Sequence, residues 1–423
     1  MERVFWCLVF VTAAVVPAAA QVDQGLAEQY FKEAQALCER DGGRLWGVSL
    51  CGPMVIADAA TGTIATNQPP PDGDRPRALG VVNAPIQWGG TTWAAYNWQM
   101  VSRDDRFARG GLFMHELFHR VQGGLGLTSE LPKLPPGSGE NAHLDALEGR
   151  YWMRLEWRAL ARALEAAGAS RLSAIADALA FRAARHQRFP RAALDEHADE
   201  ITEGIATYTQ YVIASESAQD AVRHAVAGLA GAETGTSFVQ TFAYASGAGY
   251  GLLLDALSPG WHRKFTGARD FGQLLSAAAG VTAAPDADVA AARYDGASLR
   301  AAEEQRERDR QAIVADLRRR YVDGPVLVVP RAGSGMINNA GATVIPGAGT
   351  VYLALATKGA WGFFEAKGGA LISADGQTVS LPAPVVVDAT TVRGEGWTAT
   401  VGPGWMVQPG PRPGDYRVVR QQP

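Results

Sequence analysis

The sequence has little cysteine, little net charge and no long hydrophobic run beyond its first twenty residues. The formal net charge is −4 over 423 residues, so charge gives no case for a nucleic-acid partner. No apolar run of about 18 residues follows the N-terminal segment, which argues against a membrane-spanning helix in the mature chain. No internal repeat or low-complexity segment stands out. With 47% hydrophobic residues, the composition is that of a globular protein with more than one domain.

The first twenty residues have the pattern of a secretory signal peptide. Arg3 precedes an apolar segment at 4–16, and three alanines at 18–20 form a cleavage site. We therefore expect an exported protein, periplasmic or secreted, in an oxidising environment. An uncleaved N-terminal anchor is the alternative. Removal of this segment leaves Cys38 and Cys51, which we expect to form a disulfide rather than two buried free thiols.

The residues after the signal peptide predict a small mixed sheet that follows one helix. Residues 24–39 have helical spacing, and a hairpin is expected around Gly89-Gly90. The predicted strands lie at 44–50, 54–57, 63–66, 84–88 and 92–98. The run 86–98 is our candidate for an edge strand that holds an extended substrate backbone. Its three tryptophans are more simply explained by packing within the sheet.

Longer helices and then short strands are predicted for the rest of the chain. Helical spacing occurs at 141–166, 170–187, 193–214, 218–229, 247–257 and 270–278, and the charged segment 298–321 reads as a solvated connecting helix. Beyond residue 323, Val, Thr, Gly and Pro in brief alternating runs predict an all-β domain, with strands at 326–329, 350–355, 362–365, 385–387, 397–401 and 416–419. The predicted class is α+β. The expected parts are a signal peptide at 1–20, an α/β part at 21–110, a helical part at 111–297, a connecting helix at 298–322 and an accessory β domain at 323–423.

A His-Glu-x-x-His motif is the feature with the clearest chemistry. His115 and His119 are four residues apart among apolar residues, and a glycine pair at 123–124 follows. On a buried helix that ends at these glycines, both imidazoles project from one face and can bind one metal ion. Zn²⁺ is the expected ion, with Glu116 as the general base that acts on a bound water. A chance match on an ordinary core helix is the alternative.

A catalytic zinc needs a third protein ligand, and three downstream carboxylates are candidates. Glu140 follows a Pro- and Gly-rich loop at 131–139 that we expect beside the cleft, and Glu148 lies on a helix rich in Arg and Glu. Glu203 is followed by small and apolar residues, which suits an inward-pointing carboxylate on a close-packed helix. These residues alone favour Glu203 and leave the other two as rivals.

The motif at 115–119, together with a Glu-Gly-x-Ala-x-Tyr segment at 203–208, resembles the gluzincin metallopeptidases. This resemblance covers residues 112–257 and implies a zincin-like catalytic domain, in which His115, His119 and Glu203 bind zinc and Glu116 is the base. It also points to a Tyr-x-x-Gly segment at 244–247. In the aminopeptidase branch such a tyrosine donates a hydrogen bond to the developing oxyanion, which implies that role for Tyr244.

Several features leave the details of the resemblance open. Tyr250 or His224 could supply the oxyanion donor instead of Tyr244. The sequence has no Gly-x-Met-Glu-Asn segment upstream of the motif, so exopeptidase specificity is not supported. The gap between His119 and Glu203 is also wider than in thermolysin. An acidic residue outside the ligand set could orient the ligand histidines by a hydrogen bond, and the sequence does not distinguish among three candidates: Asp195, Glu196 and Glu200.

The function expected from these features is that of an exported zinc-dependent metallopeptidase with a peptide or protein substrate. Zinc would activate a water for attack on the scissile carbonyl, and Glu116 would accept the proton and pass it to the leaving amine. Two alternatives remain: a zinc hydrolase of a non-peptide amide or cell-wall component, and a non-enzymatic exported binding protein that keeps the fold. The oligomeric state and the substrate are not predicted.

Overall fold

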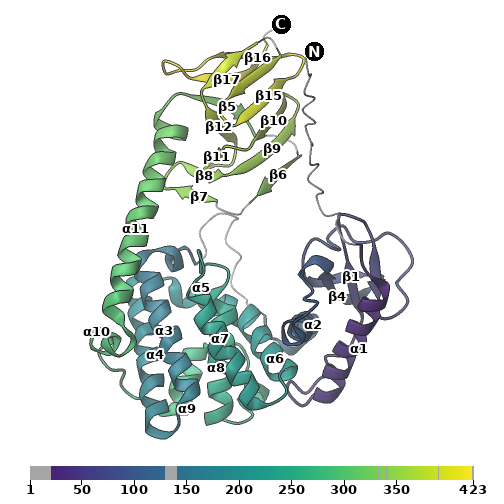
Figure 1. The fold of residues 1–423 in the computed structure, drawn as a ribbon, viewed down its shortest axis with the longest axis vertical. Coiled ribbons are helices and arrows are strands. Elements are labelled where there is room, and N and C mark those ends of the chain that lie inside the picture. The colour runs from purple at the N-terminus through teal and green to yellow at the C-terminus, as the bar shows by residue number, and fades with distance from the viewer. Residues whose placement is uncertain (1–20, 129–140, 332–333, 339–341, 389, 422–423) are drawn as a thin grey trace, which may run out of the picture. The chain divides into compact units, whose positions relative to one another are not determined.

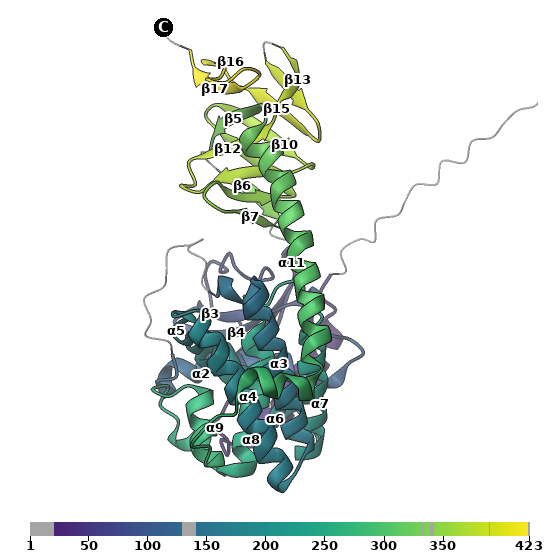
Figure 2. The same cartoon turned by 90° about the vertical axis from the view of Figure 1, so that its left-hand side faces the viewer.

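The fold is given by a computed structural model that describes residues 21–128, 141–331, 334–338, 342–388 and 390–421 (Figures 1 and 2). The chain divides into two compact units, Met1–Ala301 and Ala302–Pro423. The first unit contains a small sheet and a large helical part, and the second contains most of one long helix followed by strands. The expected α+β class is therefore confirmed at this coarse level. The predicted signal peptide at 1–20 and the predicted loop at 131–139 lie outside the described residues.

The first unit begins with a helix and a four-stranded sheet. Helix α1 (Gln24–Asp41) ends at Gly42, whose φ of 55° lies in the left-handed region that glycine tolerates. The strands are β1 (Met54–Ala57), β2 (Ile64–Thr66), β3 (Ala84–Trp88) and β4 (Thr91–Asn97), in the spatial order β2-β1-β4-β3. β4 runs parallel to β1, and β3 is the antiparallel edge strand. The predicted hairpin at Gly89-Gly90 is confirmed, because both glycines have positive φ and join β3 to β4.

The strand predicted at 44–50 is wrong, because this segment is held in a series of turns. The Asp41 carboxylate accepts hydrogen bonds from the backbone N–H groups of Gly43 and Leu45. The predicted disulfide between Cys38 and Cys51 is confirmed, with Cα atoms 5.3 Å apart. The Asp41 carboxylate and the disulfide thus hold this segment in place, and the hydrogen-bond ladder of a strand is absent from its described residues.

Helix α2 (Arg106–Gln122) carries the His-Glu-x-x-His motif and packs against β3 and β4 on one side and against the later helix α6 on the other (Figure 1). Asp105 caps it by accepting the N–H of Ala108, and the short η2 turn (Gly123–Leu125) follows it, as the glycine pair predicted. Phe113, Leu117 and Phe118 are almost fully buried. The motif is therefore on an interior helix.

The remaining helices of the first unit form a bundle around α8. Their bounds are η1 (Trp98–Met100), η3 (Ala142–Asp145), α3 (Leu147–Glu165), α4 (Gly168–Arg188), α5 (Ala192–Asp199), η4 (Glu200–Gly204), α6 (Ile205–Ala214), α7 (Ala218–Ala232), α8 (Phe242–Leu257), η5 (Trp261–Lys264), α9 (Phe271–Ala279), α10 (Ala287–Ala291) and η6 (Ala292–Tyr294). The single helix predicted at 193–214 is interrupted by η4, which is a π-helical turn. Such turns are rare and occur often at functional sites.

A network of buried charges ties five of these elements together, namely α3, α4, α5, η4 and α8. The Arg185 guanidinium on α4 binds Glu196 of α5 through two contacts of 2.7 Å and Glu156 of α3 at 2.6 Å. Arg182 on α4 binds Glu200 of η4 through two further contacts of 2.7 Å. The hydroxyl of Tyr250, on α8, donates to Glu156 at 2.7 Å. Because charges this deeply buried are costly without partners, the network fixes how α5 and η4 lie against the bundle.

The second unit is a β domain with two sheets. Their strand orders are β13-β14-β15-β10-β9-β6 and β16-β17-β5-β12-β11-β8-β7. The bounds are β5 (Val326–Pro330), β6 (Ser334–Asn338), β7 (Thr343–Ile345), β8 (Gly349–Tyr352), β9 (Ala354–Gly359), β10 (Gly362–Ala366), β11 (Ala370–Ser373), β12 (Thr378–Pro382), β13 (Pro384–Val387), β14 (Thr391–Gly394), β15 (Trp397–Val401), β16 (Trp405–Pro409) and β17 (Tyr416–Arg420). Side chains such as Trp361, Phe364 and Leu381 form its core.

Helix α11 (Gly296–Arg318), followed by the π-helical turn η7 (Arg319–Asp323), precedes the β domain. The charged pattern at 298–321 predicted this helix. Throughout the part of the chain that the structure describes, the helices lack the combination of length and apolar character that crossing a bilayer requires.

Replacement of one arginine of the buried network tests its contribution to stability. Arg185→Met leaves Glu196 and Glu156 buried without their main positive partner, so we expect the free energy of unfolding to fall by about 3–5 kcal/mol. Urea unfolding followed by circular dichroism at the helical wavelength measures the loss. Arg191→Met is the matched control, because Arg191 pairs locally with Asp195 at 2.9 Å and its own side chain is 64% exposed. Its loss is expected to stay below about 1 kcal/mol, and equal losses in both variants would contradict the role of the network.

Candidate metal centre

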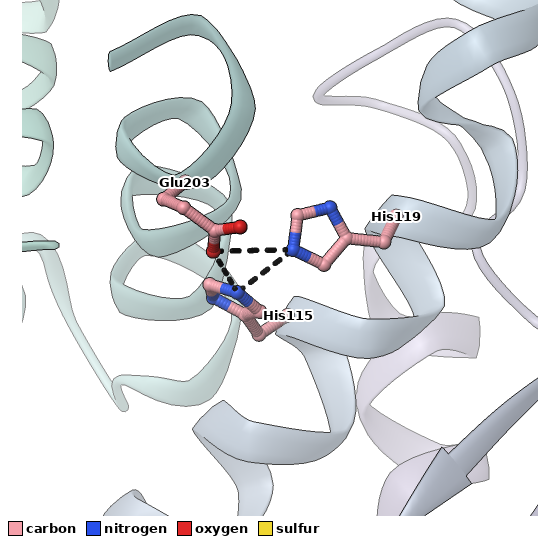
Figure 3. A group of neighbouring side chains, drawn as sticks. All are labelled: His115, His119 and Glu203. Atoms are coloured by element: carbon pink, nitrogen blue, oxygen red, sulfur yellow. Dashed lines mark hydrogen bonds and ion pairs between the residues drawn. The ribbon is translucent and has the colours of Figure 1, made fainter. Parts of the chain in front are cut away.

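Three side chains from two helices converge on one point in the first unit (Figure 3). His115 and His119 project from the same face of α2, as their spacing predicts, and Glu203 projects toward them from η4. The Nε2 atoms of the two histidines are 2.9 Å apart. The Glu203 Oε2 atom lies 3.1 Å from Nε2 of His115 and 3.4 Å from Nε2 of His119. Among the residues that the structure describes, this is the group whose ligand atoms are close enough to share a metal ion.

The donor set fits a tetrahedral cation of the zinc type. Two imidazole nitrogens and one carboxylate oxygen are the ligands that Zn²⁺ accepts, and at bond lengths of about 2.1 Å tetrahedral donors lie about 3.4 Å apart. The three atoms are separated by 2.9 to 3.4 Å, slightly less than that spacing. Lone pairs that face each other at this distance repel unless a proton or a metal cation lies between them. The arrangement could therefore hold one metal ion and leave a fourth position for a water or substrate oxygen.

The electrostatics of the three groups are strongly coupled. Burial lowers the pKa of His115, and the hydrogen bond that Glu203 accepts from this ring opposes the shift only in part. Burial acts on His119 in the same direction, but contact with Glu203 outweighs it and raises the pKa of His119. Burial would raise the pKa of Glu203, yet the two imidazoles hold it well below its usual value. Glu203 is therefore ionised at neutral pH, as a metal ligand must be.

Glu116 lies beside this group in a very different environment. Its side chain is on the interior helix α2 and the residue is only 5% exposed. Within the described residues, its Oε2 atom has no hydrogen-bond partner. Burial raises the pKa of Glu116 to about 7, despite the opposing effect of His119. A carboxylate that exchanges a proton near neutral pH suits general acid–base chemistry.

Tyr244 is the aromatic residue that the structure places at the site. It lies on α8, and its ring stacks on the His115 imidazole with centroids 5.6 Å apart and planes 9° apart. Tyr244 is 40% exposed, so part of the side chain remains accessible. Burial of the ring and the negative charge of Glu203 raise the pKa of Tyr244. The hydroxyl therefore stays protonated and able to donate.

The alternative donors lie elsewhere. Tyr250 is fully buried and uses its hydroxyl on Glu156 in the charge network. The His224 ring stacks on Phe107 near the start of α2, with centroids 3.5 Å apart.

The structure separates the rival ligands from the site. Glu148 pairs with Arg300 and Arg188 and accepts the indole N–H of Trp152. Glu140 lies outside the described residues.

The three acids considered for orienting the histidines also have other partners. Asp195 pairs with Arg191 four residues earlier, Glu200 pairs with Arg182, and Glu196 accepts from Arg185 and from the rings of His143 and His186. Glu196 and Glu200 hold helices of the bundle together, whereas Asp195 makes a local pair.

Two glutamines that the sequence analysis did not consider contact the histidines instead. The Gln122 Oε1 atom lies 2.7 Å from Nδ1 of His119. Gln210 on α6 hydrogen-bonds to His115 and raises its pKa, against the larger effect of burial. Gln122 is three residues after His119, so helical spacing could have placed it on the same face. Gln210 becomes a neighbour of His115 only when α6 packs on α2, and the sequence carries no local signal of that contact.

Close contact between two glycines places Glu203 and Tyr244 at the same site. A Cβ atom built on Gly247 of α8 would lie 2.2 Å from the carbonyl oxygen and 2.3 Å from the Cα of Gly204, which follows Glu203 in η4. The helices therefore touch backbone to backbone at this point. One turn away from Gly247 on α8, Tyr244 reaches the His115 ring.

Comparisons with known proteins do not assign the chain to a family. A scan of family models, a search of curated proteins and a search of solved structures find no match to it. The chemistry of the site must therefore be argued from its geometry.

The glycine contact gives a prediction for the metal centre. Gly247→Ala would force a methyl group into the Gly204 backbone, so we expect η4 and Glu203 to shift, with a loss of about 1–3 kcal/mol in stability and weaker metal binding. Thermal unfolding and a zinc titration measure the two effects. Gly249→Ala is the control on the same helix, because its Cβ would meet its nearest atoms at 3.5 Å or more. We expect it to be neutral or stabilising by up to about 1 kcal/mol, since alanine favours helix. Equal effects at both glycines would contradict the steric argument.

Proposed function

We propose that this chain is a zinc-dependent metallopeptidase of the gluzincin type, which acts after export. The observation that carries the proposal is the convergence of His115, His119 and Glu203 within 4.8 Å, beside the buried carboxylate of Glu116, whose Oε2 atom has no hydrogen-bond partner among the described residues. A purely structural zinc site closes all four positions with protein ligands and needs no base. Three ligands with an adjacent base are the parts of a hydrolytic centre.

The proposed chemistry assigns one role to each residue. Zinc bound by the three ligands supplies a Lewis acid that polarises the scissile carbonyl and acidifies water. Glu116 accepts a proton from the attacking water, and the carbonyl carbon gains an oxygen. The Tyr244 hydroxyl donates a hydrogen bond to the oxygen that becomes negative. Glu116 then gives its proton to the leaving nitrogen as the carbon–nitrogen bond breaks, which yields a carboxylic acid and an amine.

The proposed substrate is a peptide or protein in extended conformation. Strand β3 is at the edge of its sheet, and α2 packs against both β3 and β4. An edge strand offers free backbone groups to which an extended chain can hydrogen-bond. Of the predicted substrate-binding run 86–98, only residues 86–88 lie on the edge strand β3. Most of the rest lies on β4, which is an interior strand. Trp88 and Trp93 pack on each other inside the sheet, with ring centroids 5.3 Å apart.

Metal analysis of the purified chain is the first test of the proposal. We expect about one zinc per chain, bound by the three-ligand set typical of catalytic sites. Glu203→Ala should lose this zinc, because it removes the one anionic ligand. Glu148→Ala is the matched control and should keep it, since Glu148 is bound by arginines elsewhere. Elemental analysis after dialysis against a weak chelator gives the result, and an unmutated chain without bound metal would refute the proposal.

Replacement of the base separates chemistry from metal binding. Glu116→Gln keeps the size of the side chain but cannot accept the proton, so we expect kcat to fall by about 10²- to 10⁴-fold while zinc content is unchanged. Tyr244→Phe keeps the ring on His115 and removes only the hydroxyl, and should lower kcat by about 10²- to 10³-fold. Cleavage of a peptide library by the parent chain supplies the assay. A zinc-containing parent that cleaves no peptide but hydrolyses other amides would move the proposal to a non-peptide substrate. One that hydrolyses neither would favour a binding protein.

A further inference from the structure

Gln122 occupies a position that links the two halves of the metal centre. It is the last residue of α2, and it is buried, with 4% of its surface exposed. Its side-chain amide contacts His119 on one side and the backbone of η4 on the other. On that second side, Nε2 donates to the carbonyl oxygens of Ile201 at 2.8 Å and Thr202 at 3.2 Å. These two residues immediately precede Glu203.

The chemistry of these contacts fixes the orientation of the amide. A peptide carbonyl can only accept, so the NH₂ group of Gln122 must face Ile201 and Thr202. Its oxygen is then the atom that faces His119, at 2.7 Å from Nδ1. Because that oxygen can only accept, Nδ1 of His119 must carry the proton. The lone pair of the neutral ring is therefore on Nε2, the atom that faces His115 and Glu203.

The same amide also sets the distance between the two helices that carry the ligands. One end of it is held by a ligand histidine of α2 and the other by the turn that carries Glu203. A shift of η4 away from α2 would break two hydrogen bonds and leave a buried amide unsatisfied. The side chain thus couples the orientation of the His119 ring to the placement of Glu203.

We propose that Gln122 is a positioning residue of the metal centre, which selects the Nδ1-protonated form of His119 and holds Glu203 at ligand distance. This inference rests on the proposed metal site and assigns a function to a residue that is neither a ligand nor a catalytic group. In metal sites, such outer partners commonly change metal affinity by about 10- to 100-fold.

Two substitutions separate the acceptor from the donor function of the amide. Gln122→Met has a similar size and makes neither contact, so we expect zinc to bind about 10- to 100-fold more weakly, with an altered absorption spectrum of the cobalt-substituted protein. Gln122→Glu keeps an oxygen facing His119 but, when ionised, loses the N–H groups that hold the carbonyls of Ile201 and Thr202, so we expect it to weaken zinc binding less than Gln122→Met does. Competition with a chromophoric chelator measures the affinity for Zn²⁺, and circular dichroism checks the fold. Gln122→Asn, one methylene shorter, gives the same test if the methionine variant does not fold.

The control is Thr209→Val, which removes a buried hydrogen bond on the neighbouring helix α6. The Thr209 hydroxyl accepts the indole N–H of Trp46 at 2.9 Å and does not contact the ligand histidines. This variant should keep the affinity and the cobalt spectrum of the parent, even if it is less stable. A folded Gln122→Met protein with unchanged affinity and spectrum would overturn the inference. If Gln122→Met and Gln122→Glu weakened zinc binding equally, the acceptor function of the amide would be refuted. A parent chain that binds neither zinc nor cobalt would instead refute the metal site itself.

Discussion

The approach of η4 to α2 is the contact on which the candidate site depends. It brings Glu203 within 3.4 Å of two imidazoles that lie more than eighty residues earlier in the chain. Like-charged or lone-pair-bearing groups do not gather in this way without support from the surrounding structure. Gly204 and Gly247 supply part of that support, because their backbones touch where any side chain would intervene. The π-helical turn supplies another part, since it changes the direction of Glu203 within an otherwise regular helix.

The buried ion pairs of the helical bundle serve the same contact from the other side. Glu196 and Glu200 precede Glu203 by seven and three residues on the continuous run of α5 and η4, and both are held by arginines of α4. Arg185 and two imidazoles hold the pKa of Glu196 well below its usual value, although burial opposes the shift. Such pairs add little net stability over apolar packing, but they penalise every register of the helix in which a charge loses its partner. The position of Glu203 is thus specified by charges that are not part of the site.

The sequence predicted the local features of the structure well and its long-range contacts poorly. The helix of His115 and His119 and the Gly89-Gly90 hairpin follow from spacing and turn chemistry alone, and the disulfide was expected because only two cysteines remain after the predicted signal peptide. The strand predicted at 44–50 was wrong because the turns of this segment depend on side-chain contacts that the local pattern does not show. The Asp41 carboxylate accepts from its backbone, and Arg120 of α2 donates to the carbonyls of Leu50 and Cys51. Short strands such as β7 and β11 carry too few residues for a period to appear. Among the site residues, a helical pattern could have indicated Gln122, whereas Gln210 depends on packing between helices.

The two glutamates of the site show how one residue type can fill two roles. Glu203 faces two imidazoles, which keep its pKa low and its charge available to a cation. Glu116 comes one residue after a ligand and is buried, and this burial raises its pKa to about 7 against the opposing effect of His119. A carboxylate that is always ionised binds a metal well and makes a poor proton shuttle, while one that titrates near neutrality can accept and release a proton within a single turnover. The division of labour between ligand and base therefore follows from the surroundings of each carboxylate, and it requires no difference in the side chains themselves.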